Sequence, residues 1–239
     1  MKKLLKRFAA AAMAVALVAG LTACESGGGI SKFDASVYVK GLLDECYRGE
    51  YDSEFLDLMG ITENDADETY LSNLEVDAAN FADYYYIYNL TDEVQGQITD
   101  LFQQMYDKVA YTVKPAVKTD SGFSVEIAVT PIDVYTLVDE GYNDMVDQFY
   151  ADYYAQTGLD ILNMSNEEFN ALGEDEQNAY DYAWAQAVIT YFSAKLAESQ
   201  PLEEETLLVQ VKQDSEGMWE IPDKDWNNID TYFNYAFRY

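Results

Sequence analysis

The sequence predicts an α+β fold: a helix-rich domain with a four-stranded antiparallel sheet made of two hairpins, behind an N-terminal export segment. Three observations predict it. Apolar residues recur at helical spacing over most of the chain. Two stretches switch to strict alternation, which is typical of half-buried strands. Finally, 49% apolar and 15% aromatic residues suffice for a packed core despite the acidity of the chain.

Three helices are expected in the first half of the domain. Asp34 or Ser36 is placed to cap a helix that runs to about Arg48, where Gly49 ends it. Thr62 and Thr91 each precede acidic residues, which are favourable in a first helical turn. Each threonine therefore predicts a helix start, and the apolar stripes that follow extend over 66–85 and 94–109.

The first hairpin follows these helices. Residues 123–129 place Phe, Val and Ile at every second position, and about 110–118 form the expected partner, joined through 119–122. Pro115 has no amide proton, so the partner strand is expected at a sheet edge or with a bulge.

Helical spacing returns in the second half. A helix is expected from 134 to near Gly158, and Ser165 with Glu168 forms a capping box for a short helix to about Leu172. A long helix follows over 174–198, which Pro201 prevents from continuing.

A second hairpin pairs 207–211 with 219–221, and Asp223 is placed to cap a last helix. The two hairpin turns are similar, since residues 117–122 align with 211–217 after one insertion. An isolated hairpin is only marginally stable, so the two should share one sheet. The domain, 34–239, is then either a single unit or two similar halves, 34–131 and 132–239, because turns rich in Asp, Ser and Gly also recur by chance.

The first 23 residues have the order of an export signal. Lys2, Lys3, Lys6 and Arg7 precede an apolar run, 8–20, that is shorter than the roughly 20 residues of a membrane span. The next residues, Leu21-Thr22-Ala23-Cys24, resemble the lipobox of bacterial lipoproteins. This resemblance implies cleavage before Cys24, acylation of its sulfur with diacylglycerol, and a location on the outer face of the cell membrane. The alternative is an uncleaved signal anchor.

Behind Cys24, residues 24–33 are rich in glycine and serine and are expected to form a flexible tether with a reach of about 15 Å. Residues 1–23 hold four of the 14 basic residues and none of the 44 acidic ones, so the remaining 216 residues carry a net charge of −34. This field repels phosphate backbones, which excludes nucleic acid as a partner and favours a cationic extracellular ligand or envelope protein.

Missing residue types exclude several kinds of chemistry. The chain contains no histidine, which removes Ser-His-Asp and Cys-His catalysis and histidine-based zinc sites. After Cys24 only Cys46 remains, which we interpret as a buried small residue rather than a reactive or intermolecularly bridged thiol. Asp223-x-Asp225-x-Asn227 imitates a calcium loop but lacks its later glycine and glutamate, so it is interpreted as a helix start. No cofactor, metal site or catalytic residue is predicted.

Aromatic residues are the candidate ligand contacts. Tyr84, Tyr85 and Tyr86 are consecutive, so at least one should be exposed on a helix, and Tyr150 and Tyr154 form a second group. Exposed tyrosine beside acids suits sugar or peptide binding, although core packing is the alternative. The candidate ligand contacts are therefore Tyr84, Tyr86, Tyr150 and Tyr154.

Three short motifs resemble a known family. The segments 38–44 and 47–51 and the closing 217–221, together with the lipobox, look like uncharacterised lipoproteins of clostridial and related Gram-positive bacteria, grouped under a domain of unknown function. Helix starts of this kind and the Gly-x-Trp-x-Ile hairpin at 217–221 also resemble NTF2-like or cystatin-like α+β domains, in which a curved sheet wraps a helix and can enclose a pocket. The resemblance implies a cellular location and a fold, and it assigns no catalytic residue.

The sequence thus predicts a non-catalytic binding or scaffolding lipoprotein at the cell surface. The alternatives are capture of a small ligand, peptide or glycan for an importer, and a hydrolase that uses paired carboxylates. The 44 acidic residues make some carboxylate pair inevitable, so such a pair carries little information.

Overall fold

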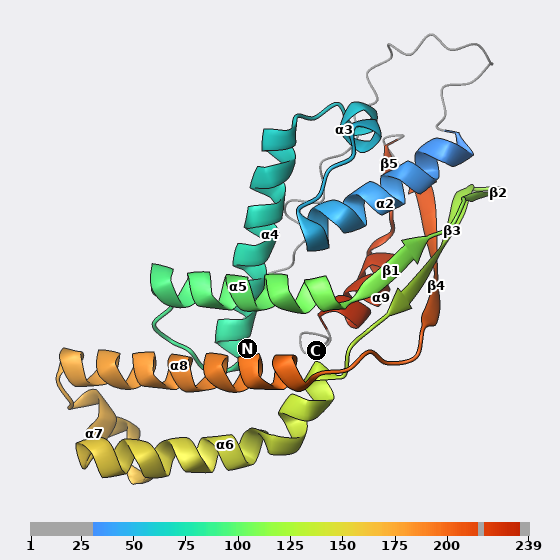
Figure 1. The fold of residues 1–239 in the computed structure, drawn as a ribbon. Helices are drawn as coiled ribbons and strands as arrows, with labels where there is room; N and C mark the ends of the chain where they lie inside the picture. Colours follow the sequence, from blue (N-terminus) through green and yellow to red (C-terminus); the bar gives the residue numbers. More distant parts are fainter. Residues whose placement is uncertain (1–30, 215–217, 235–239) are drawn as a thin grey trace.

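A computed structural model describes residues 31–214 and 218–234 (Figure 1). The predicted signal peptide, Cys24 and most of the predicted tether lie outside the described residues. Within them, helices dominate and one antiparallel sheet lies at one end, which confirms the α+β prediction. Among these residues, no helix combines the length and the apolar character that crossing a membrane requires.

The first helix begins earlier than predicted. α2 (Lys32–Arg48) is capped by Ser31, whose hydroxyl accepts a hydrogen bond from the Asp34 amide while the Asp34 carboxylate accepts one from the Ser31 amide. The capping residue is therefore neither Asp34 nor Ser36, and the tether prediction is wrong for residues 32–33. Gly49 ends the helix in a left-handed conformation, as predicted.

A short helix, α3 (Ser53–Met59), follows and was not predicted from the sequence. It buries one residue, Phe55, which packs directly on Gly41 of α2. The next two predicted starts are confirmed, because the hydroxyls of Thr62 and Thr91 cap α4 (Glu63–Tyr84) and α5 (Asp92–Lys108).

The two predicted hairpins form one sheet. β1 (Ala110–Val113) and β2 (Val117–Thr119) both pair with β3 (Gly122–Thr130), and the break between them contains Pro115 at the edge of the sheet. β4 (Glu205–Gln213) joins the hairpins by pairing antiparallel with β3, and β5 (Trp219–Glu220) completes the sheet. The single-sheet prediction is thus confirmed.

The core lies against one face of this sheet. Phe123, Val125 and Ile127 of β3 and Val209 and Val211 of β4 are buried there, and α2 and α9 pack onto the sheet. α9 (Asp223–Phe233) follows Pro222, so Asp223 is the first helical residue and not the cap. The Asp225 carboxylate accepts a hydrogen bond from the Gln210 amide of β4. The helix interpretation of the calcium-like segment is confirmed.

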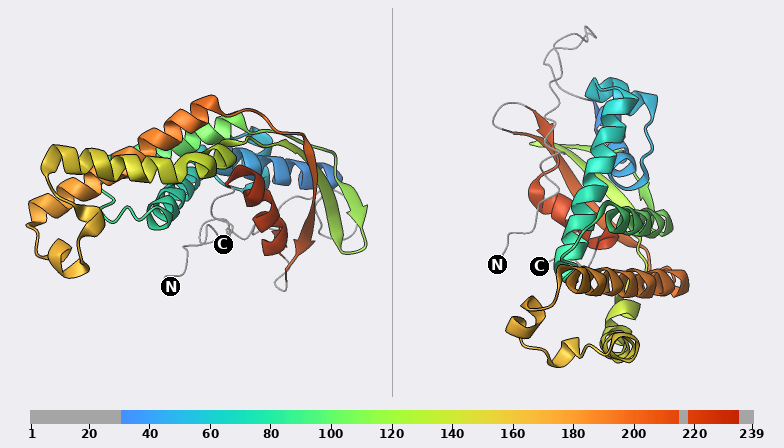
Figure 2. Two further views of the ribbon diagram at one scale, coloured as in Figure 1. Left: turned by 90° about the horizontal axis from the view of Figure 1, so that it is seen from below. Right: turned by 90° about the vertical axis from the view of Figure 1, so that its left-hand side faces the viewer.

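The other end of the molecule is a helical arm (Figure 2). α6 (Val134–Thr157) and α8 (Glu174–Glu198) pack together, with η1 (Ile161–Asn163) and α7 (Asn166–Asn170) between them at the tip. Gly158 ends α6 and the Ser165–Glu168 box caps α7, both as predicted. Figure 2 shows an elongated, curved molecule with α7 at one extreme and the sheet at the other.

Candidate functional site

Three consecutive tyrosines stand where α4 ends, and the chain turns each of them in a different direction. Tyr85 is buried and its carbonyl accepts a hydrogen bond of 2.7 Å from the indole nitrogen of Trp184 on α8. Tyr84 and Tyr86 are 48% and 65% exposed. The expectation that at least one of the three is exposed is therefore confirmed.

Tyr86 is held in an unusual backbone conformation. Its φ angle is 57°, the left-handed region, where bulky residues are rare and glycine is favoured. The Ile87 amide reaches back to the Ala82 carbonyl at 2.8 Å, which is the long hydrogen bond of a glycine-type helix ending. A large aromatic residue thus occupies a strained position on the surface.

Ring contacts connect the end of α4 to α6, because the Tyr84 ring lies 4.8 Å from that of Tyr85, which lies 5.5 Å from that of Tyr142. Burial first, and then the hydroxyls of Tyr84, Tyr150 and Tyr86, raise the pKa of Tyr142 to about 12. The hydroxyls of Tyr150 and Tyr180 lie 3.3 Å apart, which connects α6 to α8. We call these five residues, Tyr84, Tyr86, Tyr142, Tyr150 and Tyr180, the tyrosine cluster.

The four predicted aromatics have different neighbours. Tyr84 packs on Tyr85, which packs on Tyr142, and the Tyr150 hydroxyl pairs with that of Tyr180. The Tyr86 ring packs on that of Tyr88, and Tyr154 lies one turn beyond Tyr150 on α6, 55% exposed and outside the cluster. Tyr142 and Tyr180 were missed. Because Tyr142, Val146 and Tyr150 follow each other at four-residue steps, helical spacing could have added Tyr142 to the set.

Two members of the tyrosine cluster, Tyr142 and Tyr180, have raised pKa values. Burial raises the pKa of Tyr180 as well as that of Tyr142, so their hydroxyls keep their protons and both donate and accept hydrogen bonds. Tyrosine rings add apolar area with few rotatable bonds. The tyrosine cluster can therefore stack against a ligand and form hydrogen bonds with it.

Two of the hollows in the described part of the chain lie outside the tyrosine cluster. A groove of about 880 Å³ runs between α6 and α8, with Met145, Phe149 and Ala187 in its lining. A smaller pocket of about 410 Å³ lies where α6 and α9 meet the start of β4, lined by Tyr135 and Glu205 among others. The larger hollow thus lies in the arm and not between sheet and helices.

Buried carboxylates are present but do not form a facing pair in either hollow. Burial raises the pKa of Glu45 on α2 to about 7, while the neighbouring Asp44 pairs with Lys40 and accepts a 2.6 Å hydrogen bond from Tyr111. Neither acid lines the groove or the pocket. Cys46, on the same helix, is buried as predicted, with the Asn73 amide 3.6 Å from its sulfur.

Comparison with known proteins gives one similarity. No family model matches the chain, and no curated protein matches it. Among solved structures, the chain is similar to a candidate lipoprotein, ycdA, from Bacillus subtilis, with a TM-score of 0.53 and 17% sequence identity. The match covers 84% of this chain and 56% of that one, so this chain spans just over half the length of its neighbour. The likeness concerns the fold, and the NTF2-like resemblance stays a prediction.

Proposed function

We propose that the chain is an extracytoplasmic lipoprotein, anchored through Cys24, that binds an envelope partner through the tyrosine cluster without catalysing a reaction. The lipobox at residues 21–24 supports the anchor. The fold shared with a candidate lipoprotein is consistent with the same cellular address. One diacylated cysteine gives stable membrane attachment, because two acyl chains bind a bilayer where one is marginal.

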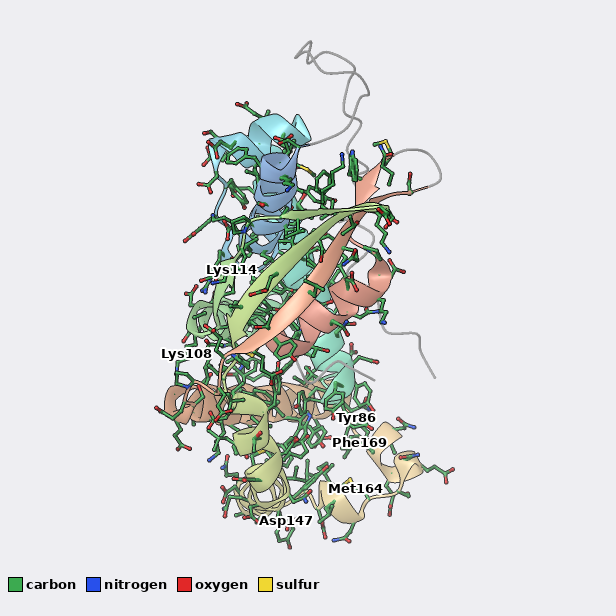
Figure 3. All side chains as sticks on the ribbon, turned by 90° about the vertical axis from the view of Figure 1, so that its right-hand side faces the viewer. Tyr86, Lys108, Lys114, Asp147, Met164 and Phe169 are labelled. Carbon is green, nitrogen blue, oxygen red and sulfur yellow. The ribbon has the colours of Figure 1, made fainter. Side chains whose placement is uncertain are left out.

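The left-handed conformation of Tyr86 carries the binding proposal. Glycine would relieve this conformation, and an exposed ring with φ of 57° costs roughly 1–3 kcal/mol that the fold must offset elsewhere. Strain of this kind is concentrated at ligand contacts, where it fixes a side chain before the ligand arrives. We therefore expect binding on the side of the molecule that carries Tyr86, which is labelled in Figure 3.

The partner should be a peptide or a sugar polymer with cationic character. Tyrosine rings and hydroxyls suit both classes, and the net charge of −34 behind Cys24 attracts positive charge. The hydroxyls of Tyr150 and Tyr180, 3.3 Å apart, add hydrogen-bonding groups to the tyrosine cluster.

Site-specific photo-crosslinking tests binding. A photoreactive phenylalanine analogue replaces Tyr86 in the anchored protein on cells, and a matched variant carries it at Leu208, which is 63% exposed on the sheet. We expect one discrete adduct from position 86 and none from position 208. Equal labelling from both positions, or labelling from neither, would contradict the proposal.

The anchor has a separate test. Cys24→Ala should abolish labelling by a fatty-acid analogue and release the protein from the membrane fraction. Labelling that persists in this variant would refute lipidation at Cys24 and leave the crosslinking result standing.

The pocket of about 410 Å³ supports a second candidate function, capture of a small ligand. Its volume lies in the range of roughly 300–1,000 Å³ that small-molecule sites occupy. Leu202→Trp should fill it. A ligand that raises the melting temperature of the unaltered protein and fails to do so in this variant would favour capture over partner binding.

A further inference from the structure

The groove between α6 and α8 borders the tyrosine cluster but does not include it. None of the five tyrosines is among its lining residues. The Phe149 ring, which does line the groove, packs 5.5 Å from the Tyr150 ring and 5.9 Å from the Tyr180 ring. The groove is therefore an adjoining surface, which the proposed function does not use.

Small residues form part of the groove floor. Ala183 and Ala187 of α8 line it beside Gly141 of α6. At Gly141 an added Cβ would lie 2.7 Å from the hydroxyl of Tyr191, which donates a 2.8 Å hydrogen bond to the Val138 carbonyl. Short side chains on neighbouring helices let a third backbone approach to the roughly 8–10 Å of packed helices.

The rest of the floor is apolar and only partly covered. Met145, Phe149 and Tyr191 line the groove and are half-buried by the contact between α6 and α8. From Gly141 to Gln156 the groove follows four turns of α6, a length of about 22 Å. A third helix of about 15 residues would cover this length.

The occupant must supply its own backbone hydrogen bonds. The groove walls are side chains of two helices, and no sheet edge lines it. An extended peptide laid there would leave its amide and carbonyl groups without main-chain partners, whereas a helix satisfies them internally.

The groove wall on α6 is acidic. Asp144 and Asp152 are exposed and lie eight residues apart, about 12 Å along the helix. The cation in the lining, Lys195, pairs with Glu198 at 3.1 Å and lies over the Tyr191 ring. The charge that faces a bound segment is therefore negative.

We propose that this groove binds a basic amphipathic helix of a partner protein, with its apolar face on Met145, Phe149 and Ala187 and its cations beside Asp144 and Asp152. Charge argues against a second copy of this chain as the occupant, because a net charge of −34 behind Cys24 opposes self-association.

Binding of a defined probe tests the proposal. A synthetic amphipathic peptide of about 16 residues carries leucines on one face and two lysines spaced as Asp144 and Asp152 are. Fluorescence polarisation measures its affinity for the full chain, and a second peptide replaces both lysines with glutamate. We expect the basic peptide to bind and the acidic one to bind at least about tenfold more weakly.

Matched variants locate the site. Asp144→Lys should weaken binding of the basic peptide about fivefold, and Ala187→Trp should block the floor. Asp147→Lys makes the same charge change on the side of α6 that points away from α8 (Figure 3) and should alter affinity by less than about twofold. Circular dichroism confirms that each variant is folded.

Three outcomes would overturn the proposal. Equal binding of the two peptides would show that charge does not select the occupant. Equal effects of Asp144→Lys and Asp147→Lys would show attraction to net charge alone. A dimer in analytical ultracentrifugation that Ala187→Trp dissolves would identify a second copy as the occupant.

Discussion

Helix α2 and the distal arm differ in how many of their residues are buried. Of the 17 residues of α2, ten are buried, including the two acids Asp44 and Glu45. In the distal arm, which we define as residues 142–183, Tyr153 is the one buried residue. The body around α2 thus has a dry core, whereas the distal arm is held by half-buried rings and helix contacts.

This difference in burial indicates which region stabilises the fold and which region is suited to binding. Local opening is easiest where few apolar side chains are buried, so amides of the distal arm should exchange with solvent faster than those of α2. Surfaces that bind partners are commonly drawn from such regions. The four predictions below should separate a body that resists substitution from an arm that tolerates it.

Gly41→Ala in the body should have the largest effect. An added Cβ would overlap the ring of the fully buried Phe55 and lie 2.7 Å from its Cβ. Overpacking of this kind should lower the free energy of unfolding by about 3 kcal/mol, measured by urea denaturation. Gly96→Ala on α5 is the matched control, because no atom lies within 4 Å of its added Cβ, and it should raise stability by about 1 kcal/mol. Similar losses of unfolding free energy in Gly41→Ala and Gly96→Ala would contradict the prediction that overpacking against Phe55 is the cause.

Glu45→Gln should reveal a pH dependence of the body. Burial raises the pKa of Glu45 from 4.5 to about 7, so the folded protein holds this proton more tightly than the unfolded chain. Stability from this group is present at low pH and is lost as the pH rises between these two values. The amide avoids the loss, so the variant should be more stable by about 2 kcal/mol at pH 8 and unchanged at pH 4. A constant difference across this range would show that Glu45 does not titrate there.

Removal of one tyrosine hydroxyl makes the same chemical change in both regions. In the body, the Tyr106 hydroxyl donates a 2.7 Å hydrogen bond to the buried carboxylate of Asp77, so Tyr106→Phe should cost about 2 kcal/mol. In the arm, Tyr150→Phe removes a 3.3 Å contact with the Tyr180 hydroxyl and should cost about 0.5 kcal/mol. Thermal melts of the two variants measure this difference, and a larger loss at Tyr150 would reverse the comparison.

Tyr86→Gly should raise stability by about 1 kcal/mol, since glycine adopts the left-handed conformation without strain and this gain exceeds the added entropy of the unfolded chain. The same variant should also lose binding to the partner. Added to cells as a competitor, it should fail to reduce the photo-crosslinked adduct that the anchored protein forms from position 86. A loss of stability would show that the ring packs favourably, and the strain argument would then fail.

Local signals predicted most helix boundaries. Thr62, Thr91 and Ser165 cap helices as expected, and α8 spans Glu174–Glu198 as the apolar spacing indicated. These features depend on residues within one turn of each other, so they can be identified without the fold. Ser31 was missed because it lies in a run that is otherwise typical of a flexible linker.

Contacts between distant segments could not be predicted. α3 has a single buried residue and gives no periodic stripe, and its position depends on Gly41. The left-handed conformation of Tyr86 and the packing of Tyr85 on Tyr142 depend on how α4 meets the arm, which no local pattern encodes. Tyr154 was predicted with Tyr150 because the two tyrosines are close in the sequence and stand beside acidic residues, and in the structure it is 55% exposed and lies one turn outside the tyrosine cluster.

The position of the Ser31 cap limits how far this domain can travel. Six residues, 25–30, separate Cys24 from Ser31, and a chain of that length spans at most about 25 Å when fully extended. With the lipid on Cys24, the rigid part of the protein begins within that distance of the bilayer. The domain would then meet its partners no further from the membrane than its own length plus this distance, and lateral diffusion along the membrane would bring the partners to it.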